Sequence, residues 1–133
     1  MEIGILNTKT LVTLFLVCYL FSMKVLGAAA IFAGGCFWCM EADFEKLKGV
    51  KIVISGYTGG NKPHPSYEEV TSQSTGHVEA IRVNYNPKIV SYKQLLNFFW
   101  RHIDPTDAGG QFNDRGSSYV SAIFYQNQQE KIF

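Results

Sequence analysis

The stretch "AAIFAGGCFWCMEADFEKLKG" (residues 29–49) predicts a strand that turns directly into a helix. Residues 29–33 are small or apolar, as in a short buried strand, and Gly34-Gly35 would end it. Apolar residues then recur at helical spacing up to Gly49, which stands where a helix would stop: Phe37, Met40, Phe44 and Leu47. We therefore expect Cys36 at the junction between the strand and the helix.

The remaining chain continues this alternation of strands and helices. Residues 50–58 and 77–85 are rich in β-branched and aromatic residues and predict strands, as does the run 119–125. Ser91 followed by Gln94 has the spacing of a capping box and predicts an amphipathic helix over residues 91–102. Residues 59–65 and 104–118 are polar and glycine-rich and predict loops. We expect one α/β domain over residues 28–133, with helices packed on a single sheet.

Composition excludes several classes of partner. The chain has 133 residues, of which 47% are hydrophobic, enough for one packed core, and its formal net charge is +1. This balance, without a basic stripe, argues against nucleic-acid binding, and no apolar run is long enough to span a bilayer comfortably. We expect no stable membrane span in the mature protein.

The first 27 residues differ in composition from the rest. Lys9 precedes the apolar run 11–23, and the small residues 27–30 follow. This order predicts a secretory signal peptide over residues 1–27, with Ala28 as the first mature residue and an exported protein, periplasmic or secreted. The alternative is a short uncleaved anchor, which the short apolar run and Lys24 fit poorly.

Cys36 and Cys39 are the cysteines that remain after cleavage, because Cys18 lies inside the apolar run. A disulfide that closes so short a loop constrains the unfolded chain weakly, so a purely structural role is a poor explanation. A zinc site would need two more ligands, and the three histidines show no paired spacing. A redox role has a physical basis, since the N-terminus of a helix stabilises a thiolate and a second thiol one turn later can resolve its oxidation products.

The side chains around this pair admit two interpretations each. Phe37 fits the apolar stripe and favours the core, whereas Trp38 points off the stripe and favours contact with a ligand. In the strand 77–85, Glu79 alternates onto the same face as Ile81 and Val83. A carboxyl among apolar neighbours is a candidate proton donor, and the alternative is a glutamate that reaches water from a frayed strand end.

Six motifs in order resemble the peptide methionine sulfoxide reductase A family, in its GCFWC subgroup, and the resemblance extends over essentially all of residues 29–125. They are "GGCFWCME" (34–41), "SGYTGG" (55–60), "PSYEEV" (65–70), "TGHVEA" (75–80), "FFWRHIDPTDAGGQFNDRGSSY" (98–119) and "SAIFY" (121–125). The resemblance implies a two-layer α/β sandwich related to the ferredoxin-like class. It also implies that the family chain continues through another helix and tail beyond Phe133.

The resemblance also implies an activity, the reduction of methionine-S-sulfoxide, free or in proteins. Cys36 matches the nucleophile and Glu79 the acid that protonates the sulfoxide oxygen. The groups that help hold this oxygen are matched by Tyr67, Asp114 and Tyr119. The pocket for the substrate methyl group is matched by Phe37 and Trp38.

The same resemblance implies how the enzyme would be recycled. Cys39 would resolve the sulfenic acid on Cys36 as a disulfide, and a thioredoxin-type protein or another dithiol would restore the thiols. No bound cofactor and no metal are expected. Two other hypotheses stay open: an exported thioredoxin-like thiol-disulfide oxidoreductase, and an inactive module that binds thioethers through Trp38.

Overall fold

The computed structural model describes residues 27–133. Its main sheet has four strands in the order β2-β3-β1-β6, and every neighbouring pair is antiparallel. The strands are β1 (Ala28–Ala33), β2 (Val50–Thr58), β3 (Val78–Tyr85) and β6 (Ala122–Phe124). The predicted signal peptide and anchor fall almost entirely on residues 1–26, outside this range.

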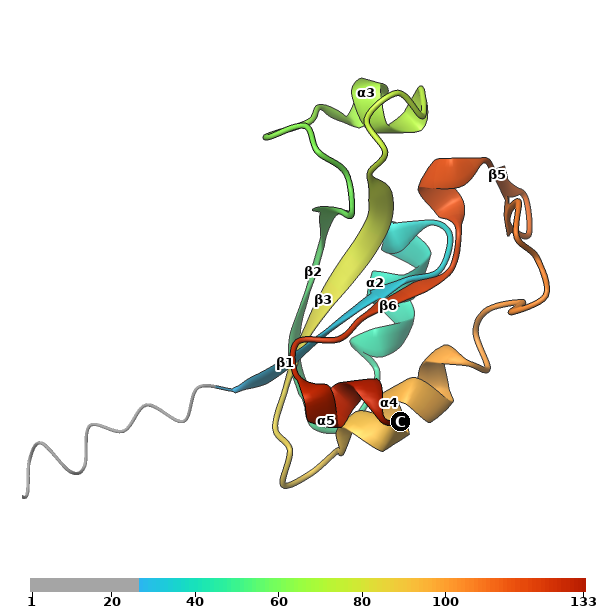
Figure 1. Cartoon of the computed structure of the whole chain (residues 1–133). Coiled ribbons are helices and arrows are strands. Elements are labelled where there is room, and N and C mark those ends of the chain that lie inside the picture. The colour runs from blue at the N-terminus through green and yellow to red at the C-terminus, as the bar shows by residue number, and fades with distance from the viewer. Residues whose placement is uncertain (1–26) are drawn as a thin grey trace, which may run out of the picture.

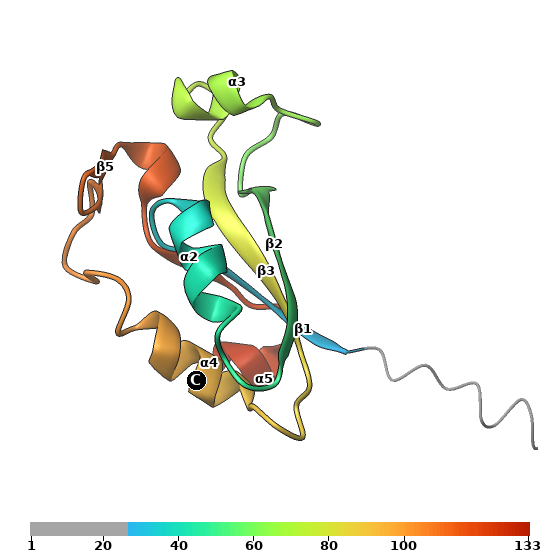
Figure 2. The ribbon, with the colours of Figure 1, turned by 180° about the vertical axis from the view of Figure 1, so that it is seen from behind.

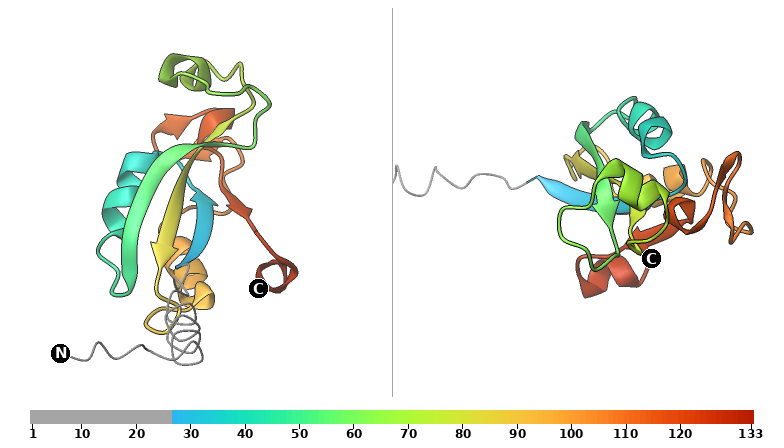
Figure 3. Two further views of the ribbon diagram at one scale, coloured as in Figure 1. Left: turned by 90° about the vertical axis from the view of Figure 1, so that its left-hand side faces the viewer. Right: turned by 90° about the horizontal axis from the view of Figure 1, so that it is seen from above.

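Helices α2 (Phe37–Phe44) and α4 (Tyr92–Phe99) lie on one face of the sheet (Figures 1 and 2). The order β1-α2-β2-β3-α4-β6 with this strand arrangement is the split βαβ topology of ferredoxin-like folds. The predicted two-layer α/β fold is therefore confirmed. A view onto the sheet shows α2 behind the strands (Figure 3, left).

The core lies between the sheet and these two helices. Phe32 of β1 stacks on Phe44 of α2 and on Phe99 of α4, with ring centroids 5.5 and 5.1 Å apart. All three rings are fully buried. The apolar periodicity that predicted both helices therefore marks the residues that fasten them to β1, and burial of such rings is the main stabilising contribution.

Smaller elements surround the sheet. Helix α3 (Tyr67–Thr71) lies over one end of it, as the view from above shows (Figure 3, right). A short hairpin follows α4 and joins the 3₁₀ helix η1 (Ser117–Tyr119). It consists of β4 (Gly110–Gln111) and β5 (Asp114–Arg115). Helix α5 (Gln128–Lys131) is capped by Asn127, whose side chain accepts a hydrogen bond from the Glu130 N–H.

Several predicted boundaries were too wide. Helix α2 ends at Phe44 rather than near Gly49, because the next turn tightens, with the Leu47 N–H donating to the Phe44 carbonyl. Helix α4 ends at Phe99 instead of residue 102 for the same reason, since the His102 N–H donates to the Phe99 carbonyl. The predicted strand 119–125 shortens to β6, because Tyr119 belongs to η1.

Candidate active site

Cys36 stands at the N-cap of α2, as the sequence predicted. Its carbonyl accepts the first helical hydrogen bond, from the Met40 N–H at 3.2 Å, and its thiol takes part in no disulfide. The backbone just before Cys36 packs closely against Gln111. A Cβ on Gly35, where φ is +86°, would lie 2.8 Å from the Gln111 Cβ. The glycine therefore lets the backbone turn sharply against Gln111 and present the sulfur at the helix start.

Glu79 reaches the same helix start from β3. The Phe37 N–H donates to Oε2 of Glu79 at 2.9 Å, so the carboxyl lies beside the residue that follows Cys36. Only 2% of Glu79 is exposed, which agrees with burial rather than a frayed strand end. Burial raises the pKa of this carboxyl, the Phe37 hydrogen bond opposes that effect, and the charge of Asp114 adds to it. The acid therefore keeps its proton to higher pH than an ordinary glutamate.

Phenol groups gather around this carboxyl. Burial raises the pKa of Tyr119, and the next contributions come from the charges of Glu79, Tyr67 and Asp114, with a further one from Cys36. A charge that raises the pKa of a phenol must lie near that phenol, because the interaction weakens with distance. Tyr119 therefore lies within electrostatic reach of Glu79, Tyr67, Asp114 and Cys36.

Tyr57 is a neighbour of Glu79 that the sequence analysis missed. It is paired with Glu79 across the β2-β3 ladder, and burial followed by the charge of Glu79 raises its pKa. Its ring lies 5.6 Å from that of Phe37. The motif "SGYTGG" contained this residue, but only the strand register shows that its phenol faces the carboxyl.

Two aromatic residues of α2 occupy different environments. Phe37 is buried in the core, whereas Trp38 is 62% exposed. The Trp38 ring is nearly parallel to that of Tyr67, with centroids 6.0 Å apart and an interplanar angle of 17°. Phe37 lies 5.2 Å from the Trp38 ring. Trp38 is therefore the member of this pair that a bound molecule can touch directly, and Phe37 supports it from below.

Cys39 lies one helical turn after Cys36 and is exposed. The pKa of its thiol is raised, first by a hydrogen bond with the Cys36 side chain, then by burial and by the charges of Cys36, Asp114 and Asp43. The two thiols are therefore close enough for Cys36 to affect the protonation of Cys39. Both are free thiols in this structure, three residues apart at the start of one helix.

The described residues 27–133 show neither a metal-binding cluster nor a membrane-spanning helix. No three side chains of His, Cys, Asp or Glu in this range gather as a metal site would require. Within the same part of the chain, no helix has the length and apolar character to cross a bilayer.

Fold and site together define an α/β protein whose paired thiols share a helix start with a buried carboxylic acid. Residues 28–133 match the family described as "Peptide methionine sulfoxide reductase". The chain belongs to the peptide methionine sulfoxide reductase family.

Curated relatives support this assignment. The chain is 57% identical over 102 residues to the peptide methionine sulfoxide reductase MsrA of Bacillus subtilis, covering 77% of this chain and 58% of that protein. It is 53% identical to the MsrA of Streptococcus agalactiae, with coverage of 77% and 60%. The chain thus spans less than two thirds of the length of these relatives.

Solved structures agree on the fold. Methionine sulfoxide reductase A of Corynebacterium diphtheriae superposes with a TM-score of 0.76 at 30% identity, covering 81% of this chain and 51% of that one. The reduced form of Mxr1 from Saccharomyces cerevisiae gives a TM-score of 0.75 at 30% identity, with coverage of 80% and 64%.

Proposed function

We propose that this protein reduces methionine-S-sulfoxide, free or within polypeptides, to methionine. One observation supports the proposal: the Phe37 N–H bond to Glu79 holds a buried acid at the helix start, beside the residue that follows Cys36. Sulfoxide sulfur is a weak electrophile until its oxygen gains a proton, so the reaction needs a nucleophile and a neutral acid at one point. Cys36 and Glu79 supply this combination.

The first step joins these two groups in one reaction. The Cys36 thiolate attacks the sulfoxide sulfur while Glu79 gives its proton to the sulfoxide oxygen. In the resulting adduct the protonated oxygen passes from the substrate sulfur to the Cys36 sulfur, while the sulfur-oxygen bond of the substrate and the transient sulfur-sulfur bond break. Methionine leaves, and Cys36 is oxidised to a sulfenic acid. In this scheme the phenols of Tyr67 and Tyr119 and the carboxyl of Asp114 would hold this oxygen, and the charges of Tyr67 and Asp114 both act on Tyr119. The substrate methyl group would rest on Trp38, with Phe37 beneath it.

The second step regenerates the thiols. The Cys39 thiol attacks the sulfenic sulfur, water leaves, and a Cys36–Cys39 disulfide forms. A thioredoxin-type protein or a small dithiol then reduces this disulfide by exchange and becomes oxidised itself. The raised pKa of Cys39 keeps this thiol protonated and unreactive while Cys36 attacks the substrate. In this scheme the chain needs no bound cofactor.

We also propose that the protein is exported from the cytoplasm. A signal peptide over residues 1–27 would leave the domain 28–133 as the mature protein, and β1 begins at Ala28, directly after the proposed cleavage site. The protein would then repair oxidised methionine outside the cytoplasm. The mass of the protein recovered from the medium or periplasm tests this start, because an uncleaved anchor would retain the first 27 residues.

A stoichiometric assay tests the activity itself. The whole chain is incubated with dithiothreitol and a peptide that contains either the S or the R epimer of methionine sulfoxide. We expect consumption of the S epimer alone and complete loss of turnover in Cys36→Ser. Reduction of both epimers, or turnover by Cys36→Ser, would contradict the assignment. Efficient reduction of disulfide substrates without any need for Glu79 would instead indicate a general thiol-disulfide oxidoreductase.

A further inference from the structure

A hollow of about 300 Å³ opens beside the two sulfur atoms. The lining includes Cys36 and Cys39, but none of Glu79, Tyr67, Tyr119 or Trp38. It is therefore continuous with the proposed reaction centre through the sulfur atoms and Asp114, which also lines it, and it extends away from Glu79 and the two phenols. Its size is at the lower end of the range typical of ligand pockets.

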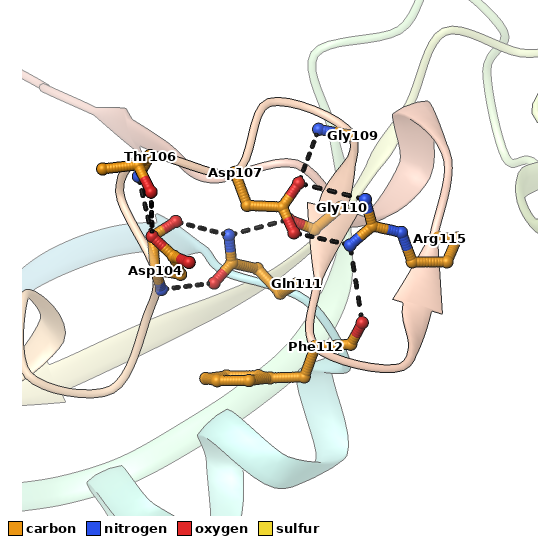
Figure 4. A network of polar contacts seen from close by, with 8 residues as sticks. All are labelled: Asp104, Thr106, Asp107, Gly109, Gly110, Gln111, Phe112 and Arg115. Carbon is orange, nitrogen blue, oxygen red and sulfur yellow. Dashed lines mark hydrogen bonds and ion pairs between the residues drawn. The ribbon is translucent and has the colours of Figure 1, made fainter.

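An exposed aromatic ring stands at this hollow. Phe112, between β4 and β5, is 69% exposed although it lines the hollow, and its φ of +53° is unusual for a bulky residue. The hairpin that carries it is fixed from both sides (Figure 4). Arg115 pairs with both carboxylate oxygens of Asp107, at 2.5 and 3.1 Å, and also donates to the Phe112 carbonyl at 3.4 Å. The ring is thus presented to solvent by a rigid frame.

Gln111 completes this frame next to Phe112. Its buried side-chain amide accepts a hydrogen bond from the Asp104 N–H at 2.7 Å and donates to the Asp104 carbonyl at 2.8 Å. Figure 4 shows these bonds around the loop, with the Phe112 ring outside the network. A ring that is held in this way can act as a contact surface without the entropic cost of ordering a flexible loop.

The charge of the hollow is negative. Asp43 and Asp114 line it, and the charges of both raise the pKa of the Cys39 thiol between them. The Asp114 carboxylate forms no hydrogen bond or ion pair within residues 27–133. His102 also lines the hollow, and its Nδ1 lies 2.7 Å from the Phe98 carbonyl while its Nε2 lies 3.9 Å from Oδ2 of Asp43.

We propose that this hollow binds a positively charged side chain, lysine or arginine, adjacent to the methionine sulfoxide in a polypeptide substrate. The inference rests on the proposed function. Two carboxylates and an exposed aromatic face match the charge and the cation–π preference of such a side chain. Free methionine sulfoxide has no flanking side chain to place in the hollow.

Lys46 pairs with one of the two carboxylates of the hollow. Its Nζ lies 2.8 Å from Oδ1 of Asp43, so the chain's own lysine partly neutralises the hollow. The pair is exposed, and exposed pairs are weak enough for a substrate cation to displace. Removal of Lys46 therefore strengthens the preference for a cationic substrate, whereas removal of Asp43 weakens it.

The experiment compares peptides that differ only beside the S-sulfoxide, where lysine, glutamine or glutamate stands before it in one series and after it in another. Dithiothreitol is the reductant, so that docking of a protein reductant cannot influence the rates. At low salt we expect kcat/KM for lysine to exceed that for glutamine by about fivefold in at least one series, as for one partly exposed ion pair. Glutamate falls below glutamine, and added salt reduces the difference.

Variants then locate the effect. Asp43→Asn and Phe112→Ala lower the lysine preference, and Lys46→Met raises it, while kcat/KM for free methionine sulfoxide is unchanged in all three. Glu45→Gln removes the same charge from a position on the same segment that does not line the hollow, and it leaves the preference intact. Equal rates for lysine and glutamate peptides, or a preference that survives Asp43→Asn, would overturn the inference alone. Absence of turnover with every peptide would overturn the proposed function and this inference with it.

Discussion

Phe37 and Glu79 are 42 residues apart in the chain and are joined by a hydrogen bond of 2.9 Å between the backbone N–H and the carboxyl. The bond ties the first turn of α2 to β3. It also turns one oxygen of the acid toward the helix, so the other can serve a substrate. The distance between the acid and Cys36 is thereby set by the fold rather than by a flexible side chain.

Glu79→Gln removes the acidic proton but keeps an acceptor for the hydrogen bond from the Phe37 N–H. The amide oxygen can still accept from the Phe37 N–H, but the side chain has no acidic proton, so we expect kcat for sulfoxide reduction to fall about 10²- to 10⁴-fold. The thermal midpoint of unfolding serves as a control for folding. Activity within about twofold of the wild-type value would remove Glu79 from the mechanism.

The raised pKa of Glu79 predicts a pH dependence of stability. The folded state holds this proton more tightly than the unfolded state, in which the pKa of Glu79 has its ordinary value of 4.5. Protonated Glu79 therefore contributes its full stabilisation of the folded state below that pH. This stabilisation is lost as pH rises through the folded pKa. The neutral Glu79→Gln variant lacks this loss, so its thermal midpoint should gain on the wild type as pH increases from 4 to 8. A difference between the two proteins that is independent of pH would contradict the raised pKa.

The sequence predicted the parts of this site that depend on local pattern. Alternation with Ile81 and Val83 placed Glu79 on the buried face, and glycines before Cys36 placed that residue at a helix start. Both placements are confirmed. Ser91 and Gln94 likewise marked the start of α4, where the structure has a complete capping box.

Other features depend on contacts between distant segments. Tyr57 faces Glu79 only because of the β2-β3 register, which alternation within one strand does not define. Helix α3 has just five residues, too few for a periodic signal, although Ser66 and Glu69 form a capping box that could have revealed its start. The hollow beside Cys39 requires the hairpin to fold back onto α2, which no local pattern indicates.

Trp38 should matter for substrate binding and little for stability. Its ring is 62% exposed and stacks on Tyr67, so Trp38→Ala removes a contact surface without opening a cavity in the core. We expect KM for a sulfoxide peptide to rise by roughly tenfold, as for loss of an apolar pocket contact. Trp38→Phe should retain much of the affinity. A change in thermal midpoint with unchanged KM would indicate a structural role instead.

Cys39→Ser tests the route of recycling. In the proposed mechanism the first turnover involves Cys36 and Glu79, so a stoichiometric burst of methionine should persist, whereas repeated turnover with a thioredoxin-type reductant should stop. Mass spectrometry after one turnover without reductant should find a Cys36–Cys39 disulfide in the wild type and a sulfenic acid on Cys36 in the variant. A free Cys39 thiol beside oxidised Cys36 in the wild-type protein would refute the proposed disulfide.

Gly35→Ala tests how strictly the backbone positions the sulfur. The new Cβ would lie 2.8 Å from the Gln111 Cβ, at a backbone φ of +86° that disfavours alanine by about 1–2 kcal/mol. We expect a lower thermal midpoint together with reduced kcat, because relief of the clash displaces Cys36 relative to Glu79. Gly56→Ala is the matched control, since an added Cβ there meets no atom within 4 Å and the change in stability should stay within about 0.5 kcal/mol. If Gly35→Ala is as stable and active as Gly56→Ala, the turn before Cys36 does not fix the geometry of the site.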